Sequence, residues 1–322
     1  MKEAASDYKP PYTLSERAVA LSIEIASALE RYKLVMEGPD GVRLRRINHI
    51  KTIRGTTAIE GNTLTEEQIT AVLAGKRIVA TQREIDEVRG AHEAYKLLGK
   101  INPYSVKDVL RVHKAMMEGL VDGAGAFRTR GVGVVDGRGN ILHMAPPAGR
   151  VSQLIGDLLT WAKTSEAHPL IKSCVFHYEF EFIHPFLDGN GRMGRFLQTA
   201  MLGKWNPLFY AAPVENIVFA NQANYYKAIN TSTAKGDSGP FIEFMLERIL
   251  EAIRTRGILT SGPINDEVLD LVRKYPGITR AKIAEVLKVN VKTVTRALAV
   301  LPQIERRGSK RFGGYFLKDS EA

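Results

Sequence analysis

Apolar side chains recur at helical spacing along most of the chain, beginning with the stretch from Ala18 to Leu34. Thr13 or Ser15 can cap this first helix, and the capping box Thr65-Glu66-Glu67-Gln68 opens another. The chain is therefore predicted to be mainly α-helical. The spacing predicts helices over residues 18–34, 42–59, from 65 onward, 81–99, 105–119, 151–163, 167–183, 191–203, 222–233, 240–256, 264–275, 279–287 and 291–301.

Two short segments have the alternation and turn residues of β-hairpins instead. Val132, Val134 and Val135 mark a strand, residues 136–140 form a glycine-rich turn, and residues 141–144 return. Near the end of the chain, the last three predicted helices precede a two-strand segment around residues 307–310. That order is typical of a helix-turn-helix with a wing.

The chain has 322 residues, a length that favours two or three domains. Thr260-Ser261-Gly262-Pro263 is the best linker, and we expect regions at 1–100, 101–258 and 264–322. No apolar run is long enough for a membrane span, and the first eight residues lack the apolar part of a signal peptide. Cys174, the only cysteine, excludes an internal disulfide, which fits a reducing, cytoplasmic location without membrane contact.

Positive charge is concentrated near the C-terminus. The net charge is +10, and residues 271–316 hold eleven lysines and arginines against two acids. A small basic module on a nearly neutral body indicates an anionic partner such as DNA. Lys292 and Arg296 fall on the predicted recognition helix, and Arg307 and Lys310 on the wing. The alternative is a docking or dimerisation module with a solvated basic face.

The segment His184-Pro185-Phe186-Leu187-Asp188-Gly189-Asn190-Gly191-Arg192-Met193-Gly194-Arg195 combines groups suited to phosphate chemistry. Pro185 should end the preceding helix at His184 and leave an imidazole facing a loop. Gly189 and Gly191 allow backbone N–H groups to turn inward, at the positive end of the next helix. The segment predicts a triphosphate site with a proton acceptor beside it, in which Asp188 can ligate a divalent metal that bridges the phosphates.

Two other interpretations of this segment are weaker. Gly189-x-Gly191-x-x-Gly194 fits the dinucleotide fingerprint GxGxxG, but it follows a helix and a His-Pro break and not a strand. The segment could also be a glycine-rich loop with solvated arginines. Arg192 and Arg195 are three residues apart, however, so they share one helix face.

Position for position, the segment matches the signature HPFx[DE]GNGRxxR, and in this the chain resembles the Fic (Fido) family of protein adenylyltransferases. Residues 125–128 resemble the GxxR element that precedes the family's flap, and residues 132–144 resemble the flap hairpin. The likeness spans roughly residues 10–255. It implies a helical Fic core with one hairpin, preceded by an N-terminal helical region and followed here by the winged helix.

The resemblance also implies roles for individual residues. His184 would be the general base, Asp188 would hold Mg²⁺, and Gly189, Asn190 and Gly191 would cradle the phosphates of ATP. The following helix turn, Arg192-Met193-Gly194-Arg195, would complete the ATP site, with both arginines on the β- and γ-phosphates. Tyr225 and Tyr226 lie where the family often has a tyrosine pair beside the adenine, although a core role is equally compatible with the sequence.

Two further residues precede the signature on the same predicted helix. His177 and Cys174 lie on faces that point toward the protein interior. We expect both to be packed core residues.

Thr56-Thr57-Ala58-Ile59-Glu60-Gly61 resembles the family's inhibitory motif [ST]xxxE[GN]. Gly61 is a natural residue to follow a helix, so Glu60 ends that helix, where its charge opposes the helix dipole. Thr56 lies one turn earlier on the same face. The expected partner of Glu60 is Arg195; the alternative is a solvated surface glutamate.

Together these features imply transfer of AMP from ATP to a Ser, Thr or Tyr hydroxyl of a target protein, or of the chain itself, restrained by Glu60. Removal of AMP is one alternative, because Glu60 could position a water. Another is a transcription regulator that senses nucleotide and acts through the winged helix. Similar proteins are often homodimers, so a homodimer is a further expectation.

Overall fold

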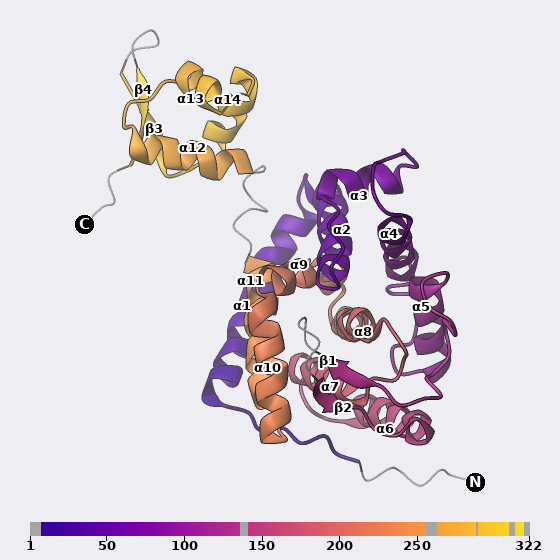
Figure 1. Ribbon diagram of the computed structural model, residues 1–322. Coiled ribbons are helices and arrows are strands. Elements are labelled where there is room, and N and C mark those ends of the chain that lie inside the picture. The colour runs from indigo at the N-terminus through magenta and orange to yellow at the C-terminus, as the bar shows by residue number, and fades with distance from the viewer. Residues whose placement is uncertain (1–7, 136–140, 255–262, 288, 309–312, 319–322) are drawn as a thin grey trace. The chain divides into compact units, whose positions relative to one another are not determined.

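The computed structural model describes residues 8–135, 141–254, 263–287, 289–308 and 313–318. The chain forms two compact units, Met1–Arg254 and Thr255–Ala322, each with its own core (Figure 1). Within the described residues, no helix is both long enough and apolar enough to cross a bilayer.

The first unit is built almost wholly from helices, which confirms the mainly α-helical prediction. Their ends follow local signals: the Ser15 side chain accepts from the Ala18 N–H, and the Thr65–Gln68 capping box forms as expected. The helices are α1 (Glu16–Glu37), α2 (Gly41–Ala58), α3 (Glu66–Leu73), α4 (Gln82–Tyr95), α5 (Val106–Met117), α6 (Val151–Thr164), α7 (Pro169–Ile183), α8 (Asn190–Trp205), α9 (Val214–Ala220), α10 (Gln222–Lys235) and α11 (Gly239–Arg254), with 3-10 turns η1 (Ala148–Arg150) and η2 (Pro207–Ala211).

The sequence pattern did not predict α9 and η2. Pro207 and Pro213 interrupt this region, and each element is too short to display a periodic apolar face. Glu215 on α9 is nevertheless buried, where it accepts hydrogen bonds from Tyr95 and Thr199. Tertiary contacts therefore hold this segment in place.

Helix α8 lies inside the first unit, against α7 and with α2 and α5 also in contact (Figure 1). Most residues of α7 and α8 are buried, including Cys174 and His177, as predicted. Helices that are buried on all sides form the rigid centre of a domain. The loop between α7 and α8 is consequently fixed at both ends.

The first unit also contains a two-stranded antiparallel hairpin. Strand β1 (Gly133–Val135) pairs with β2 (Ile141–Met144), in the register Gly133 with Met144 and Val135 with Ile141, and with an irregularity after Val134. The two predicted strands are confirmed. The predicted turn at 136–140 lies outside the described residues.

The second unit consists of three helices followed by a hairpin. Its apolar core includes Val268, Ile283, Val294 and Leu298, and an isolated β-bridge joins Ile278 to Tyr315 of the hairpin. The elements are α12 (Pro263–Lys274), α13 (Arg280–Val286), α14 (Val291–Ala299), β3 (Ile304–Arg307) and β4 (Gly314–Leu317).

Candidate active site

His184 follows α7 directly and adopts a left-handed backbone conformation, with φ 51° and ψ 62°. Among the described residues it is the only residue other than glycine with positive φ. Pro185 excludes a further helical turn, as predicted from the sequence. The conformation costs roughly 1–2 kcal/mol for a residue with a side chain, so surrounding contacts must hold it.

Arg128 supplies those contacts from the segment before the hairpin. Its Nε donates to the carbonyl oxygen of His184 at 2.7 Å, and its Nη2 reaches the carbonyls of Ile183 at 3.3 Å and Pro146 at 2.5 Å. Only 3% of Arg128 is exposed. One buried guanidinium thus joins the end of α7 to the segment that leaves β2.

The imidazole of His184 is oriented by its own helix. Its Nδ1 lies 3.3 Å from the carbonyl oxygen of Glu181. Because a carbonyl can only accept, Nδ1 carries the proton of the neutral ring, and Nε2 is the basic nitrogen. A neutral imidazole held in this tautomer is suited to take a proton from a hydroxyl.

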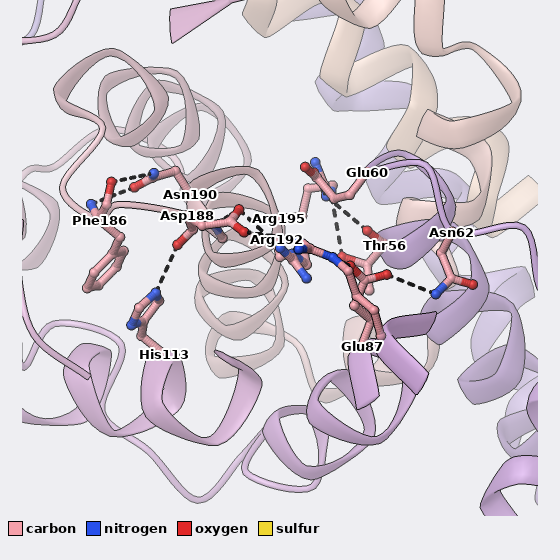
Figure 2. A network of polar contacts seen from close by, with 12 residues as sticks. Thr56, Glu60, Asn62, Glu87, His113, Phe186, Asp188, Asn190, Arg192 and Arg195 are labelled. Atoms are coloured by element: carbon pink, nitrogen blue, oxygen red, sulfur yellow. Dashed lines mark hydrogen bonds and ion pairs between the residues drawn. The ribbon is translucent and has the colours of Figure 1, made fainter. Parts of the chain in front are cut away.

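Asn190 closes the loop between the helices. Its side chain accepts from the Phe186 N–H at 2.8 Å and donates to the Phe186 carbonyl at 2.9 Å (Figure 2). The amide side chain is therefore committed to the loop. Only the backbone N–H of Asn190 is placed at the start of α8, where the sequence predicted a phosphate cradle.

Gly189, the N-cap residue of α8, has φ 84°. A Cβ atom at this position would lie 2.8 Å from Sδ of Met117, so a side chain is excluded by space as well as by conformation. The first backbone N–H groups of α8 have no partner within the helix. Together with the helix dipole they make this end of α8 suited to bind an anion, and it is called the candidate anion site.

His113 on α5 contacts the loop between α7 and α8. The sequence alone did not identify this residue. Its ring stacks on Phe186, with centroids 3.6 Å apart and planes 3° from parallel. Its Nε2 donates to the Asp188 carbonyl at 3.0 Å, while Nδ1 accepts from the Gly125 N–H at 2.9 Å (Figure 2). Burial lowers the pKa of His113 to about 4, so the ring is neutral in neutral solution.

Asp188 presents a carboxylate beside the candidate anion site. Its Oδ1 accepts from the Gly189 N–H at 2.6 Å and from Nη2 of Arg192 at 3.2 Å, and its side chain is 38% exposed. Within the described residues there is no group of three or more His, Cys, Asp or Glu that could hold a metal unaided. One exposed carboxylate next to a phosphate site suits Mg²⁺, which takes one or two carboxylates and completes its coordination with substrate phosphates and water.

Arg192 and Arg195 both lie on α8 and are 2% and 3% exposed. Nε of Arg192 is buried and has no hydrogen-bond partner in the part of the chain described. An unsatisfied buried donor on a cation is costly, so this atom indicates where an anionic ligand would bind.

Arg195 already has an anionic partner. Its Nη2 lies 2.6 Å from Oε1 of Glu60 and also donates to the Thr56 carbonyl at 3.1 Å (Figure 2). Burial alone would lower the pKa of Arg195, but Glu60, through its charge and its hydrogen bond, acts together with Tyr225 and Glu181 to raise it. The guanidinium is therefore a permanent cation, and the pair that the sequence predicted is present.

The position of Glu60 follows from the way α2 ends. Gly61, with φ 97°, donates to the Ala58 carbonyl, and Asn62 donates to that of Thr57. These two bonds form a Schellman motif, which turns the chain sharply after Glu60. A Cβ on Gly191 would lie 2.7 Å from Oε1 of Glu60, so the carboxylate lies against the first turn of α8.

The two tyrosines of the predicted adenine site differ in their surroundings. Tyr225 is 2% exposed, and its hydroxyl lies 3.1 Å from Nε2 of His177. Nδ1 of His177 lies 2.8 Å from Gln198. Tyr226 is half-buried, with its ring 5.4 Å from that of Tyr225. Of the pair, Tyr226 is thus the one at the surface.

The residues predicted to contact nucleic acid lie in the second unit. Lys292 and Arg296 are exposed and one turn apart on α14. Arg307 on β3 pairs with Glu305. Lys310 lies outside the described residues.

Known proteins show clear similarity to this chain. The sequence model described as the Fic/DOC family matches residues 103–202. Protein adenylyltransferases from Nematostella vectensis and Caenorhabditis elegans are 29% and 28% identical over 218 and 240 residues. These matches cover 63% and 68% of this chain but 48% and 45% of those proteins. The chain therefore spans about half the length of the curated relatives it matches.

Among solved structures, a Fic family protein from Desulfovibrio desulfuricans is 39% identical, with a TM-score of 0.75 over 98% of this chain and 100% of that one. The chain belongs to the Fic family. Fic-1 from C. elegans, at 23% identity and a TM-score of 0.60 over 74% of this chain and 72% of that one, shares the fold.

Within this Fic core, the structure brings most of the predicted site together. His184 and Asp188 lie in the loop between α7 and α8, and Arg192 lies in the first turn of α8. Glu60, in the turn after α2, reaches Arg195 of α8 (Figure 2). Met193 and Gly194 belong to the same turn of α8, where Met193 is buried. The supports of the loop, Arg128 and His113, come from outside the signature.

Proposed function

We propose that this Fic protein transfers AMP from ATP to a Ser, Thr or Tyr hydroxyl of a target protein. The main support is Arg192, whose buried Nε has no hydrogen-bond partner among the described residues. Arg192 lies at the start of α8, one turn from Asp188. A buried guanidinium with an N–H donor that lacks a partner is suited to bind a phosphate. The curated relatives named protein adenylyltransferase support the same reaction.

The proposed chemistry is a substitution at the α-phosphorus of ATP. Nε2 of His184 takes the proton of the target hydroxyl, the hydroxyl oxygen bonds to the α-phosphorus, and pyrophosphate leaves. The N–H groups at the start of α8 and the two arginines bind phosphate oxygens and stabilise the charge that develops on them. Asp188 would hold Mg²⁺, which neutralises phosphate charge when bound.

We further propose that Glu60 inhibits this reaction. Its carboxylate occupies Nη2 of Arg195 and lies against Gly191, in the place that a terminal phosphate needs. ATP that binds beside Glu60 would have its phosphates displaced, so the α-phosphorus would not face the hydroxyl. Release of Glu60 from Arg195 would then permit transfer.

The most direct test is the intact mass of the Glu60→Gly protein after incubation with ATP and Mg²⁺. A gain equal to one AMP establishes both nucleotide and reaction, with the chain itself as target. Loss of AMP from a previously modified protein, with no gain under these conditions, would favour the reverse reaction. No change with the chain or with any added protein as acceptor would contradict transfer.

A second function is proposed for the C-terminal unit: nucleic-acid binding as a winged helix. Its three helices and hairpin follow the order of such domains, and α14 is in the position of a recognition helix. Among the described residues, Lys292 and Arg296 have no ion-pair partner, and both are exposed. Two adjacent unpaired cations on that helix suit the phosphates of duplex DNA.

A further inference from the structure

We propose that Arg83 of α4 competes with the divalent metal for Asp188. This inference rests on the proposed Mg²⁺–ATP site. Nη2 of Arg83 lies 3.6 Å from Oδ2 of Asp188. The other oxygen, Oδ1, is taken by Gly189 and Arg192. Oδ2 is thus the oxygen left for a metal, and a guanidinium faces it.

Arg83 is held toward Asp188 by a buried acid. Its Nε donates to Oε1 of Glu87 at 3.2 Å, and Glu87 is only 6% exposed. Oε2 of Glu87 accepts from the side chain of Asn62 at 3.0 Å (Figure 2). Asn62 closes the Schellman motif after Glu60. One chain of contacts therefore connects the inhibitory turn to the metal carboxylate.

The N-terminal helices consequently place two opposite charges on the site. Glu60 puts an anion on Arg195, where a terminal phosphate would bind, and Arg83 puts a cation on Asp188, where the metal would bind. When the nucleotide is absent, the Glu60 carboxylate thus takes the place of the negative phosphate, and the Arg83 guanidinium takes the place of the positive metal. Productive binding of the complex, with its phosphates on Arg195 and its metal on Asp188, must displace both.

The expected effect of Arg83 is modest. Its side chain is 64% exposed, and exposed ion pairs contribute little because water and salt screen them. Removal of Arg83 should therefore change metal-dependent binding by about two- to fivefold. Without Arg83, nucleotide with metal should bind more tightly, because the metal has less competition for Asp188. Nucleotide without metal should bind more weakly, because the Asp188 carboxylate is no longer balanced by a positive charge.

The test is the affinity for α,β-methylene ATP, measured by calorimetry with Mg²⁺ and again with EDTA. It is made in the Glu60→Gly background, so that the phosphates can reach Arg195. The ratio of the two dissociation constants, EDTA over Mg²⁺, should rise about two- to fivefold in Arg83→Gln. Arg89→Gln is the matched control, since Arg89 lies on the same helix, is 57% exposed and pairs with Asp86.

A thermodynamic cycle separates competition at Asp188 from a general loss of positive charge. With Asp188→Asn present, Arg83→Gln should no longer alter the ratio. The inference would be overturned if the ratio were equal with and without Arg83, or if the rise persisted in the presence of Asp188→Asn. Neither result would contradict the proposed nucleotide site. Failure of the analogue to bind any variant would overturn the nucleotide site itself, and the proposed function with it.

Discussion

Arg128 donates to the carbonyl oxygen of His184 across 2.7 Å and so fixes the left-handed backbone on which the imidazole stands. The two residues are 56 positions apart, and the bond joins the start of the hairpin segment to the end of α7. The position of the proposed base therefore depends on a residue that takes no part in the chemistry.

Arg128→Ala should destabilise the first unit by about 2–4 kcal/mol, because the buried carbonyl of Ile183 and the partly buried carbonyls of His184 and Pro146 lose their donor. Urea unfolding followed by tryptophan fluorescence measures this, since Trp161 and Trp205 both lie in that unit. Arg130→Ala is the control: that side chain is exposed, and its loss should change stability by no more than about 0.5 kcal/mol. Equal stabilities of the two variants would refute the structural role of Arg128.

His184→Ala should reduce AMP transfer by about 10²–10⁴-fold while ATP binding is largely retained, because the imidazole acts on the target hydroxyl and not on the nucleotide. Labelled ATP measures transfer, and calorimetry measures binding. Transfer at the unaltered rate would show that another group is the base.

Glu60→Gly should raise self-modification by roughly 5–150-fold, the range of typical coupling energies between sites. Arg195→Ala should not imitate it, since this change also removes a phosphate ligand, and the double variant should stay slow. Glu118→Gly provides a control at the end of another helix, where the side chain is 70% exposed. If Glu60→Gly and Glu118→Gly behave alike, Glu60 is an ordinary surface residue.

The stability of the first unit should fall in mild acid through His49 and His92. Their rings share one hydrogen bond, Nε2 to Nδ1 at 2.9 Å, and burial lowers the pKa of each below 6.5. Because the folded state holds these protons less tightly than the unfolded state, the stabilisation is complete above about pH 6.5 and is lost as the pH falls below it. Unfolding free energies at pH 7.5 and 5.5 should differ less in His92→Asn than in the unaltered protein. An unchanged difference would exclude this pair as the cause.

If the C-terminal unit binds DNA, affinity should fall steeply between about 50 and 200 mM salt. Lys292→Ala with Arg296→Ala should reduce the slope of log affinity against log salt by about 2, because two DNA phosphates would no longer be neutralised by the protein. Fluorescence anisotropy of the whole chain with labelled duplex DNA measures this. Arg273→Ala, on α12 and paired with Asp270, should leave the slope nearly unchanged. Absence of binding at low salt would favour a protein-docking role.

Local sequence signals were sufficient for much of the fold. Pro185 and Gly61 ended their helices where expected, because each restricts the backbone without help from distant residues. The capping box at Thr65 is local in the same way. The pairing of Glu60 with Arg195 could be predicted only because the family resemblance placed two distant segments together.

The supporting residues could not be found from local signals. His113 lies on an ordinary amphipathic helix, and its contacts with Phe186, Asp188 and Gly125 arise only when three segments meet. Arg83 is likewise one of several arginines on the helices of the first half of the chain. Only tertiary structure distinguishes it from Arg89, because no spacing rule relates α4 to the loop after α7.

The loop between α7 and α8 has a consequence for how such proteins diversify. The proposed base, metal carboxylate and both arginines lie within residues 184–195, whereas the proposed inhibitory carboxylate lies in the turn after α2 and the proposed competing guanidinium on α4. If the two proposals hold, a single nucleotide change at Glu60 or Arg83 would alter when the protein acts without altering how it acts. Natural selection would then be able to change or remove this control while the residues of the proposed reaction stay unchanged.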